Sequence, residues 1–375
     1  AFGNNVGVYI DGDFKEDELF TSFYGSFILE ALDNEKTKKA IKEMNLKVIG
    51  RTIKDANIRY KDMAISLSEA YEAYSNTLEG VFKTKTDIVN LNIKNVYSDF
   101  KIKKFSTIKN ARPRVFIPVF PGTNCEYDCA RAFEKEGGKA ETFIFKNLSS
   151  CLIKESIDEM ARRIKDSNII MIPGGFSAGD EPEGSGKFIA NVFRNPKIKE
   201  AVNEFLSRDG LILGICNGFQ ALIKLGLLPF GEIRDIDEDS PTLTYNKIGR
   251  HVSTVCYTKV VSNKSPWFNC VNIGDVYAMP VSHGEGRFIA KEDVILNLIK
   301  NGQVATQYVD FDGNATYDIR FNPNGSYYAV EGITSPDGRI LGKMGHSERI
   351  DEDNLINIYG NKNQMLFKSG IEYFK

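Results

Sequence analysis

The sequence has almost no net charge and no long hydrophobic run, and these two absences exclude several classes of protein. Its 48 Lys and Arg residues nearly balance its 50 Asp and Glu residues, so the formal net charge is −2 and the pI is about 6.1. A chain with this balance offers no basic surface for nucleic acid or for an acidic membrane. No unbroken apolar stretch approaches the roughly twenty residues that a membrane span needs. We therefore expect no nucleic-acid partner and no membrane partner.

Cysteine and histidine are also scarce. The 375 residues include six scattered cysteines and three histidines. Scattered thiols in a long chain are typical of a reduced, cytoplasmic protein rather than of a disulfide framework. No set of them has the spacing of a zinc site, so we expect no metal. The chain has no recognisable signal peptide and begins Ala-Phe-Gly without a methionine, and we expect it to be a piece of a longer polypeptide, natural or trimmed.

The segment 211–220, Leu-Ile-Leu-Gly-Ile-Cys-Asn-Gly-Phe-Gln, is the most informative part of the chain. A short apolar run, a glycine-flanked cysteine and a following helical pattern are typical of a nucleophile elbow. The flanking glycines relieve crowding at a strained residue, and the start of a helix favours a thiolate. A lone cysteine after an apolar strand is more often a buried small hydrophobe, but this context favours a nucleophile. We predict that Cys216 is that nucleophile.

A nucleophilic cysteine needs a base, and the base needs a group that fixes its tautomer. His346 and Glu348 follow an apolar run at 339–341 and are two residues apart. If the extended run continues, both side chains project from the same side. We predict that His346 takes the thiol proton and that Glu348 holds the imidazole. His283 is the rival base, and the alternative for His346 is a surface histidine beside a solvated glutamate.

Pro173-Gly174-Gly175 follows a third apolar run, at 169–172. Glycines leave backbone amides open to a ligand, because no Cβ stands in the way. Pro-Gly-Gly alone is only a turn, but it lies one strand–helix unit before the cysteine elbow. We predict that one of its amides, together with the amide of Asn217, binds the oxyanion of a tetrahedral intermediate.

Residues 184–187, Gly-Ser-Gly-Lys, resemble a phosphate-binding loop only superficially. Glu181 stands where the Walker motif needs its first glycine, and Phe188 stands where it needs Ser or Thr. We expect no nucleotide to bind at this motif.

The chain from residue 114 alternates short apolar runs with helical patterns, which predicts an α/β fold with a doubly wound, mostly parallel sheet. In such sheets ligands bind at the carboxyl ends of the strands, where both the Pro-Gly-Gly turn and the cysteine lie. After Pro229 the pattern of residues predicts a β-rich insertion, followed by a final strand and a last helix. The expected strands are 115–119, 141–145, 169–172, 211–215, 254–261, 276–279, 304–310, 327–331 and 340–344; the expected helices are 125–136, 155–164, a stretch up to 207, and one from about 363.

The first 100 residues predict a smaller α+β segment, with strands at 27–30 and 46–50. Ser66-Leu67-Ser68-Glu69 is a capping box that predicts a helix start. Apolar residues at helical spacing in that helix are expected to be core: Tyr71, Tyr74, Leu78 and Phe82. The stretch 101–114 has six basic residues and no acid, and we expect residues 101–113 to be a linker. The expected division is therefore 1–100, 101–113 and 114–375.

Five motifs resemble those of the class I glutamine amidotransferases, which have a flavodoxin-like fold. They are Pro121-Gly122-Thr123-Asn124-Cys125-Glu126, Gly174-Gly175-Phe176-Ser177-Ala178-Gly179-Asp180, Gly214-Ile215-Cys216-Asn217-Gly218-Phe219-Gln220, Ser282-His283-Gly284-Glu285-Gly286-Arg287-Phe288 and Gly345-His346-Ser347-Glu348-Arg349. Over about residues 114–374 the similarity is closest to the C-terminal end of the phosphoribosylformylglycinamidine synthase family of purine biosynthesis. Residues 1–100 resemble, more weakly, the C-terminal part of its aminoimidazole ribonucleotide synthetase-like half.

The resemblance implies that Cys216 attacks the side-chain amide of glutamine and forms a thioester, with His346 and Glu348 completing a triad. It implies an oxyanion hole from the amides of Gly175 or Phe176 and of Asn217. The implied glutamine pocket comprises Gly174, Gln220, Ser282, His283, Gly284 and Glu285. Position 347 is serine where the family pattern has proline. The implied partners are glutamine and the upstream synthase domains; ATP and magnesium belong to that upstream part, so no cofactor is expected here.

Two other functions remain open. A related cysteine hydrolase or peptidase would share the elbow, but in those proteins the histidine commonly follows the nucleophile directly, where this chain has Asn217. The second alternative is a gated or inactive docking module of the larger synthase, since such glutaminases are often controlled by partner domains.

Overall fold

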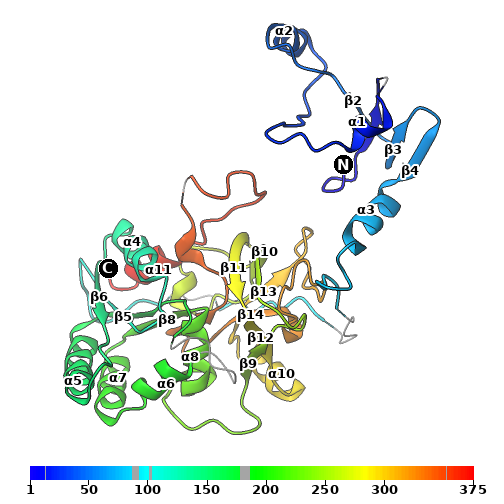
Figure 1. Cartoon of the computed structure of the whole chain (residues 1–375). Helices are drawn as coiled ribbons and strands as arrows, with labels where there is room; N and C mark the ends of the chain where they lie inside the picture. Colours follow the sequence, from blue (N-terminus) through cyan, green and yellow to red (C-terminus); the bar gives the residue numbers. More distant parts are fainter. Residues whose placement is uncertain (13, 87–92, 101–103, 178–185, 352) are drawn as a thin grey trace. The chain divides into compact units, whose positions relative to one another are not determined.

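The computed structural model describes residues 1–12, 14–86, 93–100, 104–177, 186–351 and 353–375. The chain forms two compact units, Ala1–Lys85 and Thr86–Lys375 (Figure 1). Gly184 and Ser185 of the phosphate-loop-like motif, and positions 178–180 of the glycine-rich motif, lie outside the described residues.

The first unit contains a four-stranded sheet of order β2-β1-β3-β4. Its strands are β1 (Gly7–Ile10), β2 (Gly50–Ile53), β3 (Asn57–Tyr60) and β4 (Met63–Ser66), and its helices are α1 (Glu16–Phe20), α2 (Glu35–Glu43) and α3 (Leu67–Asn76). The predicted helix start at the capping box is confirmed. Ser66 is the N-cap of α3, and its hydroxyl accepts a hydrogen bond from the amide of Glu69 at 3.2 Å.

Three expectations for this unit are wrong. Residues 27–30 form no strand, and Phe27 is 87% exposed. The strand expected at 46–50 begins only at Gly50. The aromatic stripe is not core, because Tyr74 is 71% exposed and the helix ends at Asn76, before Leu78 and Phe82. The rings of Tyr71 and Tyr74 contact the ring of Phe2, with centroids 5.4 and 5.9 Å away.

The second unit is organised around a nine-stranded sheet of order β11-β10-β13-β14-β15-β8-β7-β5-β6. The strands are β5 (Arg114–Val119), β6 (Lys139–Ile144), β7 (Ile169–Ile172), β8 (Leu211–Ile215), β10 (Val252–Val260), β11 (Val276–His283), β13 (Val304–Val309), β14 (Val330–Thr334) and β15 (Ile340–Lys343). The five strands from β15 to β6 are parallel to one another. The predicted α/β fold with a doubly wound, mostly parallel sheet is confirmed.

The parallel half is buried on both faces, which explains its continuous apolar runs. Every residue of β7 and β8 is buried. Figure 1 shows α4 and α11 on one side of these strands and α5, α6, α7 and α8 on the other. The helices of this unit are α4 (Glu126–Lys135), α5 (Ser150–Asp166), α6 (Lys187–Phe193), α7 (Pro196–Ser207), α8 (Asn217–Leu225), α9 (Leu227–Phe230), α10 (Glu292–Lys300) and α11 (Leu366–Glu372).

The β-rich segment after Pro229 extends this same sheet with antiparallel strands. β14 pairs antiparallel with β15, and β13, β10 and β11 follow in turn. Two further strands, β9 (Thr242–Tyr245) and β12 (Glu285–Ile289), form a separate antiparallel pair that the sequence patterns did not reveal. The helix α10 was also not expected. β15 is therefore the border strand, parallel to β8 on one side and antiparallel to β14 on the other.

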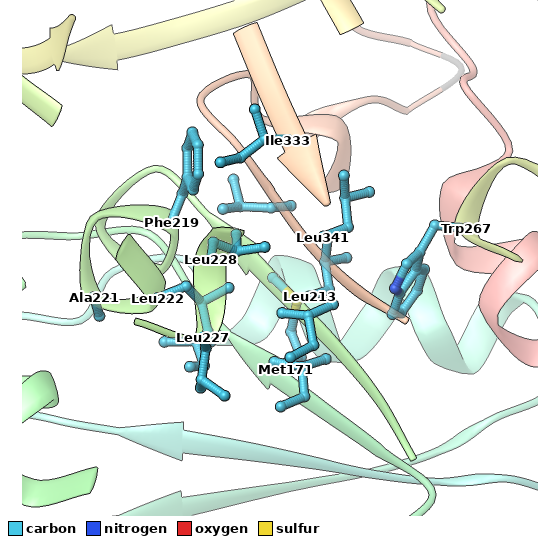
Figure 2. Close-up of a cluster of buried hydrophobic side chains, with 14 of the residues drawn as sticks. Met171, Leu213, Phe219, Ala221, Leu222, Leu227, Leu228, Trp267, Ile333 and Leu341 are labelled. Atoms are coloured by element: carbon cyan, nitrogen blue, oxygen red, sulfur yellow. The ribbon is translucent and has the colours of Figure 1, made fainter. Parts of the chain in front are cut away.

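The core lies where α8 and α9 pack on the centre of the sheet. Figure 2 shows Phe219, Leu222 and Leu228 from these helices beside Leu341 and other buried strand residues. A Cβ placed on Gly342 of β15 would lie 2.1 Å from the Phe219 ring, so the helix approaches the strand as closely as a glycine allows. This tight packing fixes the helix start, and hence the turn before it.

The described residues between Thr86 and Arg114 are part of the second unit and contact its later elements. Val96 is buried, Ser98 forms a parallel bridge with Ser262, and the amide of Thr107 donates to Asp209 at 3.0 Å. The boundaries at 100 and 114 between synthase tail, linker and amidotransferase domain stay a prediction. In the part of the chain that the structure describes, no helix combines the length and the apolar character needed to cross a membrane.

Candidate active site

Cys216 occupies a strained turn between β8 and α8. Its backbone angles are φ 53° and ψ −106°, a conformation that side chains other than glycine rarely adopt. The Cys216 amide donates to the carbonyl of Lys343 on β15 at 2.8 Å, and its own carbonyl accepts from the amide of Gln220 at 3.0 Å. Strand and helix therefore hold the turn from both ends, as the predicted elbow requires.

The two glycines around the cysteine are needed for close approach. A Cβ on Gly218 would lie 2.0 Å from the carbonyl oxygen of Ile172 on β7, and a Cβ on Gly214 would lie 2.8 Å from the carbonyl oxygen of Gly218. Neither gap admits a methyl group, because backbone atoms lie within 2.8 Å of each added Cβ and Cδ1 of Leu222 is closer still, at 2.6 Å, to the one on Gly214. The start of α8 thus sits directly on the carboxyl ends of the parallel strands.

His346 follows β15 by three residues, and its amide donates to the carbonyl of Pro280 at 2.9 Å. Its Nδ1 lies 2.6 Å from Oε1 of Glu348, and both side chains are buried. The expected extended run does not continue, since Ser347–Arg349 form a 3-10 turn instead. The two side chains meet because the chain turns, not because they alternate along a strand.

Cys216, His346 and Gly174 converge on one point. A Cβ placed on Gly174 would lie 2.8 Å from Cε1 of His346 and 3.5 Å from Cβ of Cys216. The Sγ of Cys216 contacts the carbonyl oxygen of Ser282 at 3.6 Å, and Nε2 of His346 is buried with no hydrogen-bond partner among the described atoms. The sulfur and the imidazole are thus neighbours across the end of β7, with Nε2 available for proton transfer.

Electrostatics favour an imidazolium at His346. Burial alone would lower the pKa of this imidazole, but the Glu348 carboxylate and hydrogen bonding with Cys125 and Cys216 raise the pKa well above its ordinary value. Burial would likewise raise the pKa of Glu348, yet the charge of His346 and its hydrogen bond hold that pKa below the ordinary range. His346 therefore carries its proton at neutral pH, and this positive charge lies beside the sulfur of Cys216.

A second cysteine borders the triad. Cys125 is the N-cap of α4 and is fully buried. Its Sγ lies 3.9 Å from Nδ1 of His346, and the guanidinium of Arg349 donates to it at 3.0 Å. Both residues lie in motifs that carry the family resemblance, and that was the only signal in the sequence for their place at the site.

Ligand atoms of Cys125, His346 and Glu348 all lie within 4.8 Å of one another, the only such group among the described residues. A cation there would have to displace the 2.6 Å bond between His346 and Glu348, and it would meet the guanidinium of Arg349. The arrangement suits a hydrogen-bonded triad better than a metal centre.

Not every backbone amide of the glycine-rich turn is free to bind a ligand. The amide of Phe176 donates to the carbonyl of Gly122 at 2.8 Å, so it is already paired. This contradicts the expectation that Phe176 supplies an oxyanion donor. The amides of Gly175 and Asn217 have no hydrogen-bond acceptor among the described residues, and the side chain of Asn217 accepts from the amide of Ser177 at 3.3 Å. Gly175 and Asn217 are thus the two available donors.

Gln220 ties the elbow helix to β12 rather than opening into a pocket. Its Oε1 accepts from the side chain of Asn217 at 2.9 Å, and its Nε2 donates to the backbone carbonyl of Glu285. The amide oxygen and the amide nitrogen each have a hydrogen-bond partner, and the residue is 4% exposed. We therefore infer that Gln220 supports the site and holds the backbone of Glu285 in place.

The junction of β11 and β12, at 282–285, contributes one histidine that stays neutral. Nδ1 of His283 contacts Oδ1 of Asn246 at 3.0 Å, which places the ring proton on Nδ1. Burial, followed by the nearby His346 and His251, lowers the pKa of His283 to about 3. Ser282 contacts Nε2 of His251 through its hydroxyl at 3.0 Å. A histidine that stays neutral, and whose ring contacts an amide rather than a carboxylate, is a poor rival to His346 as the acid–base residue.

Comparisons with known proteins agree with this geometry. A family model of the CobB/CobQ-like glutamine amidotransferase domain matches residues 112–374. The phosphoribosylformylglycinamidine synthase subunit PurQ of Methanococcus maripaludis strain C7 is 34% identical over 280 residues, which is 70% of this chain and 97% of that subunit. PurQ of Dehalococcoides mccartyi is 37% identical over 242 residues, covering 64% and 86% of the two chains.

Among solved structures, one chain in the structure of PurLQS from Thermotoga maritima superposes with a TM-score of 0.51 at 28% identity. The alignment covers 70% of this chain and 100% of the Thermotoga chain.

Proposed function

The chain belongs to the family of CobB/CobQ-like glutamine amidotransferase domains, and we propose that it hydrolyses glutamine to supply ammonia for phosphoribosylformylglycinamidine synthesis in purine biosynthesis. The PurQ subunits to which it is similar carry that synthase's name. The activity of the complete enzyme is that of a carbon–nitrogen ligase with glutamine as amido donor. The observation that carries the proposal is the meeting of Cys216, His346 and Glu348 at the carboxyl ends of β8 and β15.

The proposed reaction begins with attack of the Cys216 sulfur on the side-chain carbonyl of glutamine. His346, which is protonated at neutral pH, gives its Nε2 proton to the departing ammonia. The γ-glutamyl thioester remains on Cys216. The neutral imidazole then takes a proton from water, which attacks the thioester and releases glutamate. Glu348 keeps the ring oriented through Nδ1 in both steps.

We assign the oxyanion hole to the amides of Gly175 and Asn217. They flank Cys216 from the end of β7 and from the start of α8, and both are free of other acceptors among the described residues. Gly174 supports the proposal because its missing side chain leaves room beside the sulfur. Ser282, Gly284 and Glu285 are assigned to the glutamine pocket. The backbone carbonyl oxygen of Ser282 lies 3.6 Å from Sγ of Cys216.

The partner that consumes the ammonia is proposed to be the synthase machinery. Residues 1–100 are assigned to the tail of the synthase half, with 101–113 as linker and 114–375 as the amidotransferase domain. The proposed hydrolysis of glutamine uses only the side chains of Cys216, His346 and Glu348, together with water. ATP and magnesium are accordingly assigned to the synthase part, and the cytoplasm is the proposed location.

The test is mass spectrometry of the full chain after incubation with an electrophilic glutamine analogue, with ammonia release from glutamine measured in parallel. We expect one adduct on the peptide that contains Cys216, and ammonia release that Cys216→Ala abolishes. A labelled chain that barely hydrolyses glutamine would support gating by partner domains. Glutaminase activity retained in Cys216→Ala would refute the assignment.

A further inference from the structure

A buried ion pair contacts the residues on either side of His346, the proposed catalytic base. Lys343, the last residue of β15, and Glu331 of β14 are both 0% exposed, and Nζ lies 3.5 Å from Oε1. Lysine and glutamate are almost never buried completely unless they are paired. Replacing such a pair with apolar side chains of similar volume is often neutral or stabilising. Fold stability alone therefore does not explain why two charges occupy this place.

The contacts of the pair converge on the loop that carries His346. Oε1 of Glu331 accepts from the amide of Gly345 at 2.7 Å. Nζ of Lys343 donates to the carbonyl of Gly345 at 2.9 Å and to the hydroxyl of Ser347 at 3.0 Å. Gly345 and Ser347 are the residues immediately before and after His346. The ion pair thus holds the chain on both sides of the catalytic residue.

Lys343 also holds the nucleophile. Its backbone carbonyl accepts the amide of Cys216 at 2.8 Å. A single residue therefore links the turn that carries the sulfur to the loop that carries the imidazole. On the other side, the hydroxyl of Thr306 on β13 donates to the second carboxylate oxygen of Glu331. The pair is anchored in the antiparallel strands and reaches across to the parallel half.

The serine at position 347 belongs to the same arrangement. Its hydroxyl accepts from Lys343 and donates to Oε1 of Gln364 at 3.1 Å. The family pattern has proline at this position, and proline would offer the lysine no side-chain acceptor. The buried lysine and the departure from the family pattern are therefore parts of one network.

We propose that the Lys343–Glu331 pair is a positioning device for the catalytic base, holding loop 344–347 so that Nε2 of His346 faces Cys216. This inference deepens the proposed function and rests on it. Neither side chain touches the reacting atoms, and both act through the backbone of Gly345 and the hydroxyl of Ser347. Misplacement of a base by about 1 Å can cost on the order of 100-fold in rate.

The test compares the intact chain with the double variant Lys343→Met/Glu331→Leu, which removes both charges and keeps an apolar volume. We expect a cooperative thermal transition at or above the wild-type temperature, a KM within twofold, and a glutaminase kcat lower by on the order of 10- to 100-fold. Ser347→Ala keeps the ion pair and removes only one tether, so a smaller fall in kcat is expected. The exposed pair Lys165–Glu204, replaced by two glutamines, is the matched control and should leave all values unchanged.

A second readout does not depend on glutamine. Alkylation of Cys216 by iodoacetamide across pH reports the coupling between the thiol and the imidazole, and the double variant is expected to shift this profile. A folded double variant with wild-type kcat and an unshifted alkylation profile overturns the proposal. If the wild-type chain hydrolyses no glutamine but the alkylation profile still shifts, the proposed function fails while the positioning role stands.

Discussion

Nδ1 of His346 lies 2.6 Å from Oε1 of Glu348, with both side chains almost completely removed from water. In such surroundings the carboxylate acts on the imidazole with little screening by solvent. The bond fixes which nitrogen is left to face Cys216, and the charge of Glu348 keeps the ring protonated. Both the orientation of the His346 ring and its protonation therefore depend on Glu348.

Replacing Glu348 with glutamine should lower the alkaline limit of activity. The carboxylate raises the pKa of His346, so in the wild type the imidazolium that protonates ammonia persists above the ordinary histidine range. In Glu348→Gln the alkaline limb of kcat moves to lower pH, and kcat falls by about a thousandfold or more. Glutaminase rates across pH measure both effects. Glu348→Asp, which keeps the charge, serves as control; an alkaline limb unmoved by Glu348→Gln would contradict the assignment.

The two sulfurs near the imidazole should behave differently. Cys125 contacts His346 and Arg349 but belongs to the start of α4, not to the turn between β8 and α8. Cys125→Ala should retain the electrophile adduct on Cys216, whereas Cys216→Ala should lose it. Peptide mapping of the adduct in both variants decides the matter. An adduct that persists at Cys125 in Cys216→Ala with measurable ammonia release would reverse the roles.

A single methyl group at Gly174 should damage the site. The new Cβ would lie 2.8 Å from Cε1 of His346 and 3.2 Å from Sγ of Cys125, so the histidine must shift. Overpacking of this kind costs about 1–3 kcal/mol of stability, and we expect at least a tenfold fall in kcat. Chemical denaturation and glutaminase assays measure the two effects. Gly80→Ala, where nothing lies within 4 Å of the added methyl, should change neither.

Acid should destabilise the second unit partly through His283. Its pKa is about 3 in the folded chain, against about 6.5 in the unfolded chain, so the unfolded state binds more protons between these values. The stability that this neutral histidine contributes is present above pH 6.5 and is lost as the pH falls toward 3. The slope is about 1.4 kcal/mol per pH unit within that window.

His283→Asn tests this linkage, since the asparagine amide can still donate to Asn246 in place of Nδ1. Urea titrations of both proteins at several pH values between 7.5 and 4.5 give the two slopes. We expect the variant to show the shallower dependence of unfolding free energy on pH. Parallel slopes would mean that His283 does not contribute.

Much of the second unit could be predicted from the sequence because its parallel strands are buried on both faces. β7 coincides with the predicted strand at 169–172, and β8 with that at 211–215. A short continuous apolar run between turn residues is typical of a fully buried strand. The elbow was recognisable because its glycines, strand and helix are adjacent in sequence. The antiparallel pair β9–β12 was missed because its strands have only four and five residues and contain no long apolar run.

The first unit shows where periodicity fails. Tyr71 and Tyr74 recur at helical spacing, but spacing does not reveal whether another element covers that face of α3. The role of Gln220 was similarly hidden, because its partner, the backbone of Glu285, is 65 residues away in the chain. The meeting of Cys125 with His346 spans 221 residues, and only the folded chain brings the two together.

The border position of β15 has a consequence for inactivation by heat. The sulfur follows β8 and the imidazole follows β15, and these strands are hydrogen-bonded neighbours with Lys343 opposite Ile215. The strands that carry the two groups are thus held at the spacing of adjacent strands, about 4.8 Å, in the middle of the largest sheet. Melting of that ladder on heating removes the frame on which both groups depend. We therefore expect turnover to be lost on heating no later than the sheet itself.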